Sequence, residues 1–295
     1  MKLPNFIIIG VQKAGTTSVY NYLNQHPQIY MSPVKETNFL EKDWEELPNS
    51  SKSKIDTLEK YCQLFEGAQD EIAIGEASPN YLFHYESSSR RIQRYVPNAK
   101  LIAILRNPAE RAYSDYLMHI RDAIGNGKQT SLAEQIKFKA HKSFLIRKGF
   151  YYTPLKHYFE AFGKDQINVY LYDDLCKDSG EFMREMYRFL GVDDTFTADV
   201  SKKAQVAQVP KSNWLNTLLR KQNPLRAAVA SGLRYILPLE TRQNIRSNLI
   251  QINSQDKKTA PLSAEERQQL VELYREDILS LQDLLQRDLS SWLTI

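Results

Sequence analysis

The sequence begins with a loop whose residue types suit the binding of an anion. Gly10 and Gly15 are separated by four residues, as in loops that cradle phosphate groups, and a helical pattern starts at Thr16. The first N–H groups of a helix have no partner within the helix, so they are available to an anion. A nucleotide triphosphatase carries a lysine at the position of Thr16, where it reaches the terminal phosphate. Here the lysine of the loop is Lys13, three places earlier.

A second cation stands at the end of a predicted strand. The run "KLIAILR" ends in Arg106, whereas a magnesium-dependent nucleotide enzyme would end this strand with an aspartate that holds the metal. The sequence therefore predicts a nucleotide with an additional phosphate, chemistry without magnesium, and no metal site.

Short, apolar and β-branched runs alternate with helical patterns along the first two thirds of the chain. Such runs are typical of parallel strands that are buried between helices. The predicted fold class is α/β, a P-loop-type parallel β-sheet flanked by helices. The expected strands are residues 5–10, 71–78, 100–106 and 166–172, and the expected helices are residues 16–25, 87–95, 108–122, 153–162 and 179–190.

The last third of the chain has a different pattern. The strand signal ends after Asp194, residues 211–251 read as helices interrupted by prolines, and residues 262–289 read as a long closing helix. Ser263 and Glu266 have the spacing of a helix start. We expect one domain over residues 1–295, with a nucleotide-binding core (1–195) and a helical C-terminal layer (196–295).

Composition restricts the class of protein further. Hydrophobic residues make up 42% and charged residues 25%, as in ordinary globular proteins. Two distant cysteines predict neither a disulfide framework nor a zinc site. The absence of a signal-peptide pattern and of a membrane-spanning run predicts a cytoplasmic protein. The net charge of +4 conceals a basic segment, residues 201–258, with eleven Lys and Arg against two acids. We expect no nucleic-acid partner. For the basic segment, a role as a lid or core helix is favoured over contact with a membrane. The sequence is compatible with a homo-oligomer.

The motifs together resemble a known family. "GVQKAGTTSVYNYL" with "LIAILRNPAERAYSDY" is similar to the paired signature of sulfotransferases that use 3′-phosphoadenosine 5′-phosphosulfate (PAPS). The likeness continues through "GEASPNYL" and "KGFYYTPLKHYFEAFGKDQINVYLYDDL" to "RFLGV", about residues 4–195. The bacterial and heparan-sulfate-like branches are the most similar. The resemblance implies transfer of a sulfuryl group from PAPS to a hydroxyl or amine of a small-molecule or saccharide acceptor, with release of adenosine 3′,5′-bisphosphate (PAP).

The resemblance also implies roles for particular residues. Arg106 and Ser114 would hold the 3′-phosphate; the alternatives are a structural ion pair and an ordinary helix serine. Lys202 and Lys203 fall where relatives have a basic loop that closes over the same phosphate. The 5′-phosphosulfate would be held by Lys13, Ala14, Gly15, Thr16, Thr17 and Ser18.

The candidate catalytic residues are Glu36 and Lys13. "SPVKETNFL" matches the family segment that carries the base, so Glu36 would deprotonate the acceptor while Lys13 stabilises the leaving oxygen. The alternative for Glu36 is a surface carboxylate paired with Lys35 or Lys42. His84 and His119 are the bases to consider if Glu36 is not one. In heparan-type enzymes a lysine stands at the position of Ala77, which puts a heparan-like acceptor in doubt.

Two other functions are compatible with parts of the pattern. A nucleotide or small-molecule kinase would share the strand, loop and helix but would need magnesium. A non-catalytic anion- or lipid-binding module would use the basic and apolar stretch around Trp214 and Tyr235. The acceptor is not indicated. Its pocket is expected around residues 36–44, 78–85 and 119–122 and the basic segment 201–258, and the aromatic residues there suit a sugar, a phenol or a natural-product alcohol equally.

Overall fold

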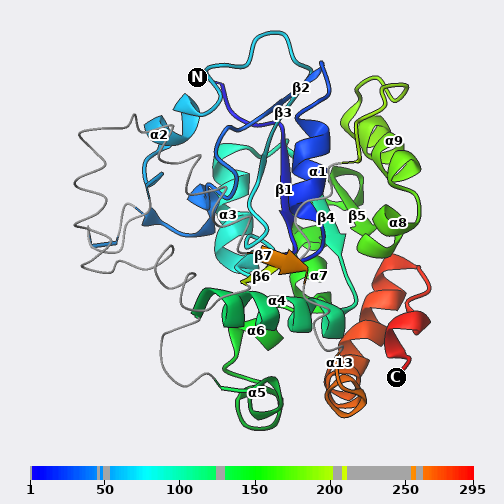
Figure 1. Ribbon diagram of the computed structural model, residues 1–295. Coiled ribbons are helices and arrows are strands. Elements are labelled where there is room, and N and C mark those ends of the chain that lie inside the picture. Colours follow the sequence, from blue (N-terminus) through cyan, green and yellow to red (C-terminus); the bar gives the residue numbers. More distant parts are fainter. Residues whose placement is uncertain are drawn as a thin grey trace, which may run out of the picture.

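The computed structural model describes residues 2–44, 47–48, 54–123, 130–201, 208–210, 254–256 and 262–295 (Figure 1). Its centre is a five-stranded sheet, and each pair of neighbouring strands is parallel. The four predicted strands are confirmed; the three-residue β2 was not predicted, because its run is too short for a clear pattern. In spatial order the strands are β2 (Ile29–Met31), β3 (Ala73–Ala77), β1 (Phe6–Gly10), β4 (Lys100–Leu105) and β5 (Ile167–Leu171).

Helices flank this sheet, as the sequence predicts for an α/β protein. Six helices confirm predicted ones: α1 (Thr16–Leu23), α3 (Tyr85–Tyr95), α4 (Pro108–Ala123), α7 (Tyr152–Phe162), α9 (Ser179–Leu190) and α13 (Ala264–Leu285). The remaining elements were not predicted: α2 (Leu58–Gln63), α5 (Leu132–Lys139), α6 (Phe144–Arg147), α8 (Tyr172–Lys177), and the 3₁₀ turns η1 (Phe39–Glu41), η4 (Lys164–Gln166) and η5 (Ser290–Leu293). In the parts of the chain just described, no helix is both long and apolar enough to cross a membrane.

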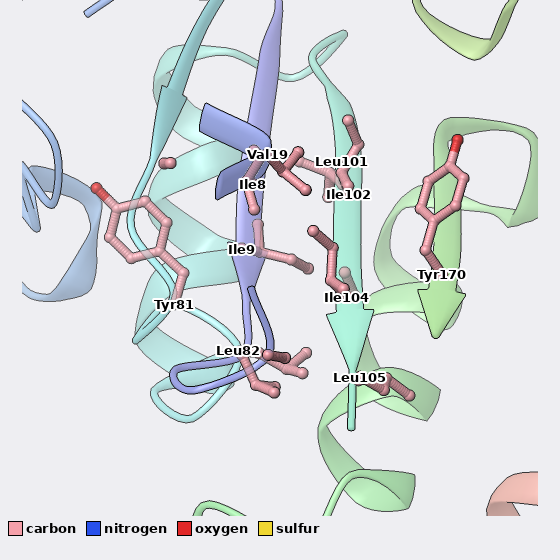
Figure 2. Close-up of a cluster of buried hydrophobic side chains, with 14 of the residues drawn as sticks. Ile8, Ile9, Val19, Tyr81, Leu82, Leu101, Ile102, Ile104, Leu105 and Tyr170 are labelled. Atoms are coloured by element: carbon pink, nitrogen blue, oxygen red, sulfur yellow. The ribbon is translucent and has the colours of Figure 1, made fainter. Parts of the chain in front are cut away.

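The core of the sheet is built on β1 and β4. The side chains from Phe6 to Ile9 and from Leu101 to Leu105 are completely buried. Figure 2 shows the isoleucines of the two strands side by side in this cluster, with Val19 of α1 beside them. Burial of a large aliphatic side chain stabilises a fold by roughly 1.5–3 kcal/mol. These two strands therefore form the most strongly fixed part of the sheet.

The strand order places two loops side by side. β1 pairs with β4 in parallel, so both strands end at the same edge of the sheet. The register shifts between Ile8 and Gly10, and beyond the strand Val11 N donates to Ile104 O at 2.9 Å. Ligands of open parallel sheets bind at the carboxyl ends of the strands. The loop after β1 and the start of α4 after β4 therefore form the candidate site.

The C-terminal part differs in one respect from the sequence pattern. Residues 208–210 (β6) and 254–256 (β7) pair as antiparallel strands, although no strand was expected after Asp194. The helices expected over residues 211–251 lie outside the described residues. α13 packs against α4, α5 and α7, and its cap is confirmed because Ser263 Oγ accepts from Glu266 N at 3.2 Å.

Asp277 on α13 caps the beginning of α7. Its carboxylate accepts the N–H groups of Tyr151 (2.8 Å) and Tyr152 (3.2 Å). Burial raises the pKa of Asp277 to about 6, although these two hydrogen bonds oppose the shift. The folded state therefore binds this proton more tightly than the unfolded state does. As pH rises from about 4 to about 6, the free energy of unfolding loses the contribution of this proton.

We predict that Asp277→Asn removes this part of the pH dependence. Asparagine cannot ionise, and its side-chain oxygen still accepts an N–H of α7. The free energy of unfolding of Asp277→Asn relative to wild type should rise between pH 4 and pH 7, by on the order of 2–3 kcal/mol. Urea unfolding at several pH values measures this difference. Asp283→Asn, at an exposed position of the same helix, is the control. The prediction would be contradicted if the free energy of unfolding of Asp277→Asn relative to wild type changed with pH no more than that of Asp283→Asn does.

Candidate functional site

The loop between β1 and α1 has the backbone geometry of an anion site. Lys13 and Gly15 have left-handed backbones, with φ of 74° and 81°. A Cβ added to Gly15 would lie 2.8 Å from Leu175, so the loop packs closely on α8. α1 begins directly at Thr16, has no side-chain cap and carries no acid in its first turn. Its first N–H groups and the positive end of its dipole are therefore available to a negative group.

Arg106 lies beside this loop. Its guanidinium donates to the carbonyl of Lys13 at 3.0 Å and covers the ring of Tyr172 at 4.8 Å from the ring centroid. The nearest carboxylate oxygen recorded, on Glu110, is 4.0 Å away, and Glu110 also contacts Arg267 on α13. The structural ion pair considered for Arg106 is thus long and shared. Contacts with a carbonyl and a ring hold the guanidinium in place without neutralising its charge.

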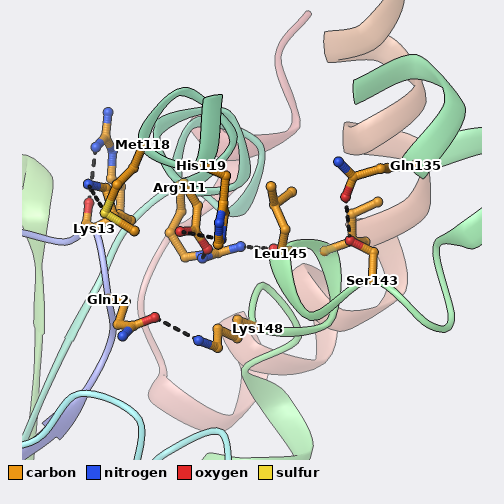
Figure 3. Close-up of polar contacts among 12 residues, drawn as sticks. Gln12, Lys13, Arg111, Met118, His119, Gln135, Ser143, Leu145 and Lys148 are labelled. Atoms are coloured by element: carbon orange, nitrogen blue, oxygen red, sulfur yellow. Dashed lines mark hydrogen bonds and ion pairs between the residues drawn. The ribbon is translucent and has the colours of Figure 1, made fainter. Parts of the chain in front are cut away.

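Ser114 lies on α4, half-buried, eight residues after Arg106. It precedes Met118 by four residues, so both occupy one face of the helix. The Sδ atom of Met118 accepts from Lys13 Nζ at 3.6 Å (Figure 3). Ser114 therefore belongs to the helix face that meets the loop, as its predicted role requires.

Glu36 lies in the segment between β2 and η1. Its N–H donates to the carbonyl of Ala77 at 2.9 Å, which ties it to the end of β3. Its carboxylate pairs with Lys35 Nζ at 2.7 Å and is 38% exposed. The pairing that was the alternative to a catalytic role is therefore present. The negative charge of Glu36 also acts on the pKa of Lys148, less than those of Asp115 and Glu41 do.

Lys148, which the sequence analysis did not single out, contacts the loop between β1 and α1. Its Nζ donates to Gln12 Oε1 at 2.6 Å, directly beside Lys13 in the loop (Figure 3). Burial lowers the pKa of Lys148 and the charge of Arg111 adds to this, while the carboxylates of Asp115, Glu41 and Glu36 act in the opposite direction. The sequence signal was its position before Gly149 in the "KGFYY" stretch that resembles the family.

His84 lies on the same side of the site as Lys148. Its Nε2 is 3.6 Å from Glu41 Oε1. Burial lowers the pKa of His84, and the charges of Lys148, Lys42 and Arg147 add to this effect against the opposing charge of Glu41. A histidine that stays neutral can accept a proton, so His84 is the alternative base that the geometry supports better. His119 is 65% exposed on α4, with Nε2 3.7 Å from Asp115.

The remaining predicted residues divide by exposure. Ala14 and Thr16 are buried, Thr17 is exposed and Ser18 is half-buried, so the hydroxyls of α1 differ in access to a ligand. Lys202 and Lys203 lie outside the described residues.

Among the residues that the structure does describe, no cluster of three or more His, Cys, Asp or Glu side chains could hold a metal. A narrow recess between the loop and Lys148 is lined by Val11, Gln12, Pro79, Leu82, Phe83, Lys148, Phe150, Tyr151 and Pro154.

The fold and the site together define an α/β protein with an anion-binding loop at the carboxyl edge of a parallel sheet. The sulfotransferase domain family matches residues 3–234. The chain therefore belongs to the sulfotransferase family, a family of transferase enzymes.

Individual relatives agree with this family. The chain is 30% identical over 247 residues to human bifunctional heparan sulfate N-deacetylase/N-sulfotransferase 1, which covers 79% of this chain and 27% of the relative. It is 34% identical over 119 residues to the membrane-associated sulfotransferase kil1 of Dictyostelium discoideum, covering 40% and 24%. The crystal structure of a sulfotransferase from Alicyclobacillus acidocaldarius is similar with a TM-score of 0.69, 26% identity and 99% coverage of both chains. The chain spans about a quarter of the length of the curated relatives it matches.

Proposed function

We propose that this chain transfers a sulfuryl group from PAPS to a hydroxyl or amine of an acceptor and releases PAP. The observation that carries the proposal is the contact between Arg106 and the carbonyl of Lys13 at 3.0 Å. This contact joins two anion sites, one at the loop and one at the start of α4. PAPS has two such anionic groups, a 5′-phosphosulfate and a 3′-phosphate.

The residues of the site have separate roles in the proposed reaction. Glu36 takes the proton of the acceptor as the new bond between the acceptor atom and sulfur forms. The bond between sulfur and the bridging oxygen breaks, and its electron pair leaves on the 5′-phosphate of PAP. Lys13 and the N–H groups of α1 stabilise this negative charge. Catalysis of this kind depends mainly on positioning and on electrostatic stabilisation.

The acceptor side of the site offers aromatic rings and cations. Arg147 lies over the half-buried ring of Phe83 at 5.3 Å, and Lys42 lies over the buried ring of Trp44 at 4.5 Å. These groups suit a saccharide or a small aromatic molecule. Relatives named as N-sulfotransferases of heparan sulfate support an amine on a saccharide as one acceptor class to test.

The competing functions have less support. A kinase would need a carboxylate for magnesium at the end of β4, where this chain has Arg106. The stretch that favours an anion- or lipid-binding module lies outside the described residues.

The proposal is tested by binding and by transfer. Calorimetry in the presence of a chelator should show PAP binding in the micromolar range or tighter. Labelled PAPS should pass its sulfuryl group to at least one member of a panel that contains an aminoglycan, a phenol and an aliphatic alcohol. Loss of PAP binding on chelation would favour a kinase, and binding without transfer to any acceptor would favour a non-catalytic module.

We predict that Arg106→Ala weakens PAPS and PAP far more than adenosine 5′-phosphosulfate, which lacks the 3′-phosphate. A hydrogen bond to a charged group contributes roughly 1.5–3 kcal/mol, which corresponds to an affinity loss of about 10- to 150-fold. Arg287→Ala is the matched control. This substitution removes the same charge from a surface arginine that pairs with Asp174 at 2.6 Å. Equal losses for ligands with and without the 3′-phosphate would mean that Arg106 supports the fold instead.

We predict that Glu36→Gln keeps PAP affinity but lowers single-turnover transfer by roughly 10²- to 10⁴-fold, the usual contribution of a general base. Lys13→Ala should also lower transfer, with a smaller effect on PAP affinity than Arg106→Ala, because its stabilisation is greatest in the transition state. Glu160→Gln, at an exposed position on α7, is the control. Transfer by Glu36→Gln at the wild-type rate would assign the base to His84 or His119.

A further inference from the structure

A completely buried carboxylate, that of Glu76 on β3, lies beside the segment that carries Glu36. Its side chain is 0% exposed. In the described part of the chain, its recorded hydrogen bonds all come from hydroxyl groups, two to each carboxylate oxygen. Oε2 accepts from Thr37 (2.6 Å) and Ser78 (2.9 Å), and Oε1 accepts from Tyr61 (2.8 Å) and Tyr81 (2.9 Å).

Three of these hydroxyls also hold the backbone of the segment after Glu36. Each of these three hydroxyl oxygens accepts one N–H and also bonds a carboxylate oxygen of Glu76, and Thr37 Oγ1 lies in addition 3.2 Å from the hydroxyl of Tyr81. Burial raises the pKa of Glu76, and the four hydrogen bonds counteract this. The three N–H bonds run from Asn38 to Ser78 (3.1 Å), from Phe39 to Thr37 (3.3 Å) and from Leu40 to Tyr81 (3.1 Å).

The backbone of this segment needs such support. Glu36 and Asn38 have φ of 62° and 51°, in the left-handed region that residues with a Cβ rarely adopt. Each such residue costs roughly 1–3 kcal/mol and persists only where its surroundings hold it. The N–H of Glu36 is fixed to Ala77 at 2.9 Å, and the next three N–H groups after Thr37 are fixed through hydroxyls to Glu76.

We propose that Glu76 is a positioning residue for the reaction. Through Ser78, Thr37 and Tyr81 it fixes the backbone of residues 38–40, and so it sets the direction in which Glu36 presents its carboxylate. Polar networks in which every member is satisfied rigidify a structure in this way. The inference rests on the proposed function of Glu36 as the base.

Two tyrosines allow a matched experiment. Tyr61 and Tyr81 are both completely buried, and both donate to Oε1 of Glu76. Of the two, Tyr81 is the one recorded as also accepting an N–H of the segment. Tyr61→Phe and Tyr81→Phe therefore each remove one bond to Oε1, whereas Tyr81→Phe alone also releases the Leu40 N–H and the 3.2 Å contact with Thr37 Oγ1.

The first measurement is amide hydrogen exchange, which needs no acceptor. Tyr81→Phe should speed the exchange of the Leu40 amide by roughly tenfold or more, as expected for a lost hydrogen bond, and Tyr61→Phe should leave it near wild type. Equal exchange at Leu40 in the two variants would overturn the network. Thr37→Ser, which keeps its hydroxyl, should exchange like wild type at Phe39, and Thr37→Val should not.

The second measurement is single-turnover transfer from PAPS to the panel acceptor that wild type uses fastest. Tyr81→Phe should lower the rate roughly 10- to 100-fold, the effect of a small misplacement of a catalytic group, with PAP affinity unchanged. Equal rates for Tyr81→Phe and Tyr61→Phe would overturn the positioning role.

The final comparison separates this inference from the proposed function. In a Glu36→Gln background, Tyr81→Phe should cause no further loss, because both changes act on the same group. A full additional loss would show that the network does not act through Glu36. Wild-type transfer by Glu36→Gln alone would refute the base and with it the positioning role, while the exchange data would still decide whether the network holds the segment.

Discussion

The parallel pairing of β1 with β3 on one side and β4 on the other is the constraint on which the site depends. Beyond the strands, the same backbone continues to fix the loops. The carbonyl of Ile8 accepts from Ser78 at 3.0 Å, the carbonyl of Ile9 accepts from Leu82 at 2.8 Å, and that of Ile104 accepts from Val11 at 2.9 Å. Three segments from distant parts of the sequence therefore meet at one edge of the sheet. Because these strands are buried, a shift in their register would displace the whole site.

Two cations, Arg106 and Lys148, donate hydrogen bonds to the loop at this edge. Arg106 lies on the side of α4, where its contacts leave it suited to an anion. Lys148 donates to Gln12 of the same loop, and the charges of Asp115 and Arg111 on α4 act on its pKa. Lys148 therefore adds a second cation beside the loop, next to Gln12.

Much of the fold was predictable from the sequence, because buried parallel strands and capped helices leave local patterns. The four longer strands, α1 and the cap at Ser263 are examples. The hydrogen bonds of Glu76 could not be predicted from local patterns. Its place in an apolar run marks it as unusual, but the hydroxyls that satisfy it come from positions 37, 61, 78 and 81, which meet only in the folded chain. Lys148 was likewise unassigned because its partner, Gln12, is 136 residues away. The short β2 and β6 were missed because three residues carry too little periodicity.

The contact between Arg267 and Glu110 joins the C-terminal helix to the donor side of the site. Glu110 is also the carboxylate nearest to Arg106 among the recorded ion pairs, at 4.0 Å. A change of α13 that withdraws Arg267 removes one of the two cations that Glu110 contacts, and the attraction of Glu110 for Arg106 then competes with any anion that Arg106 binds. Under the proposed function, the affinity for PAPS in chimaeras of family members would therefore be inherited in part with the C-terminal helix, and not with the N-terminal loop alone.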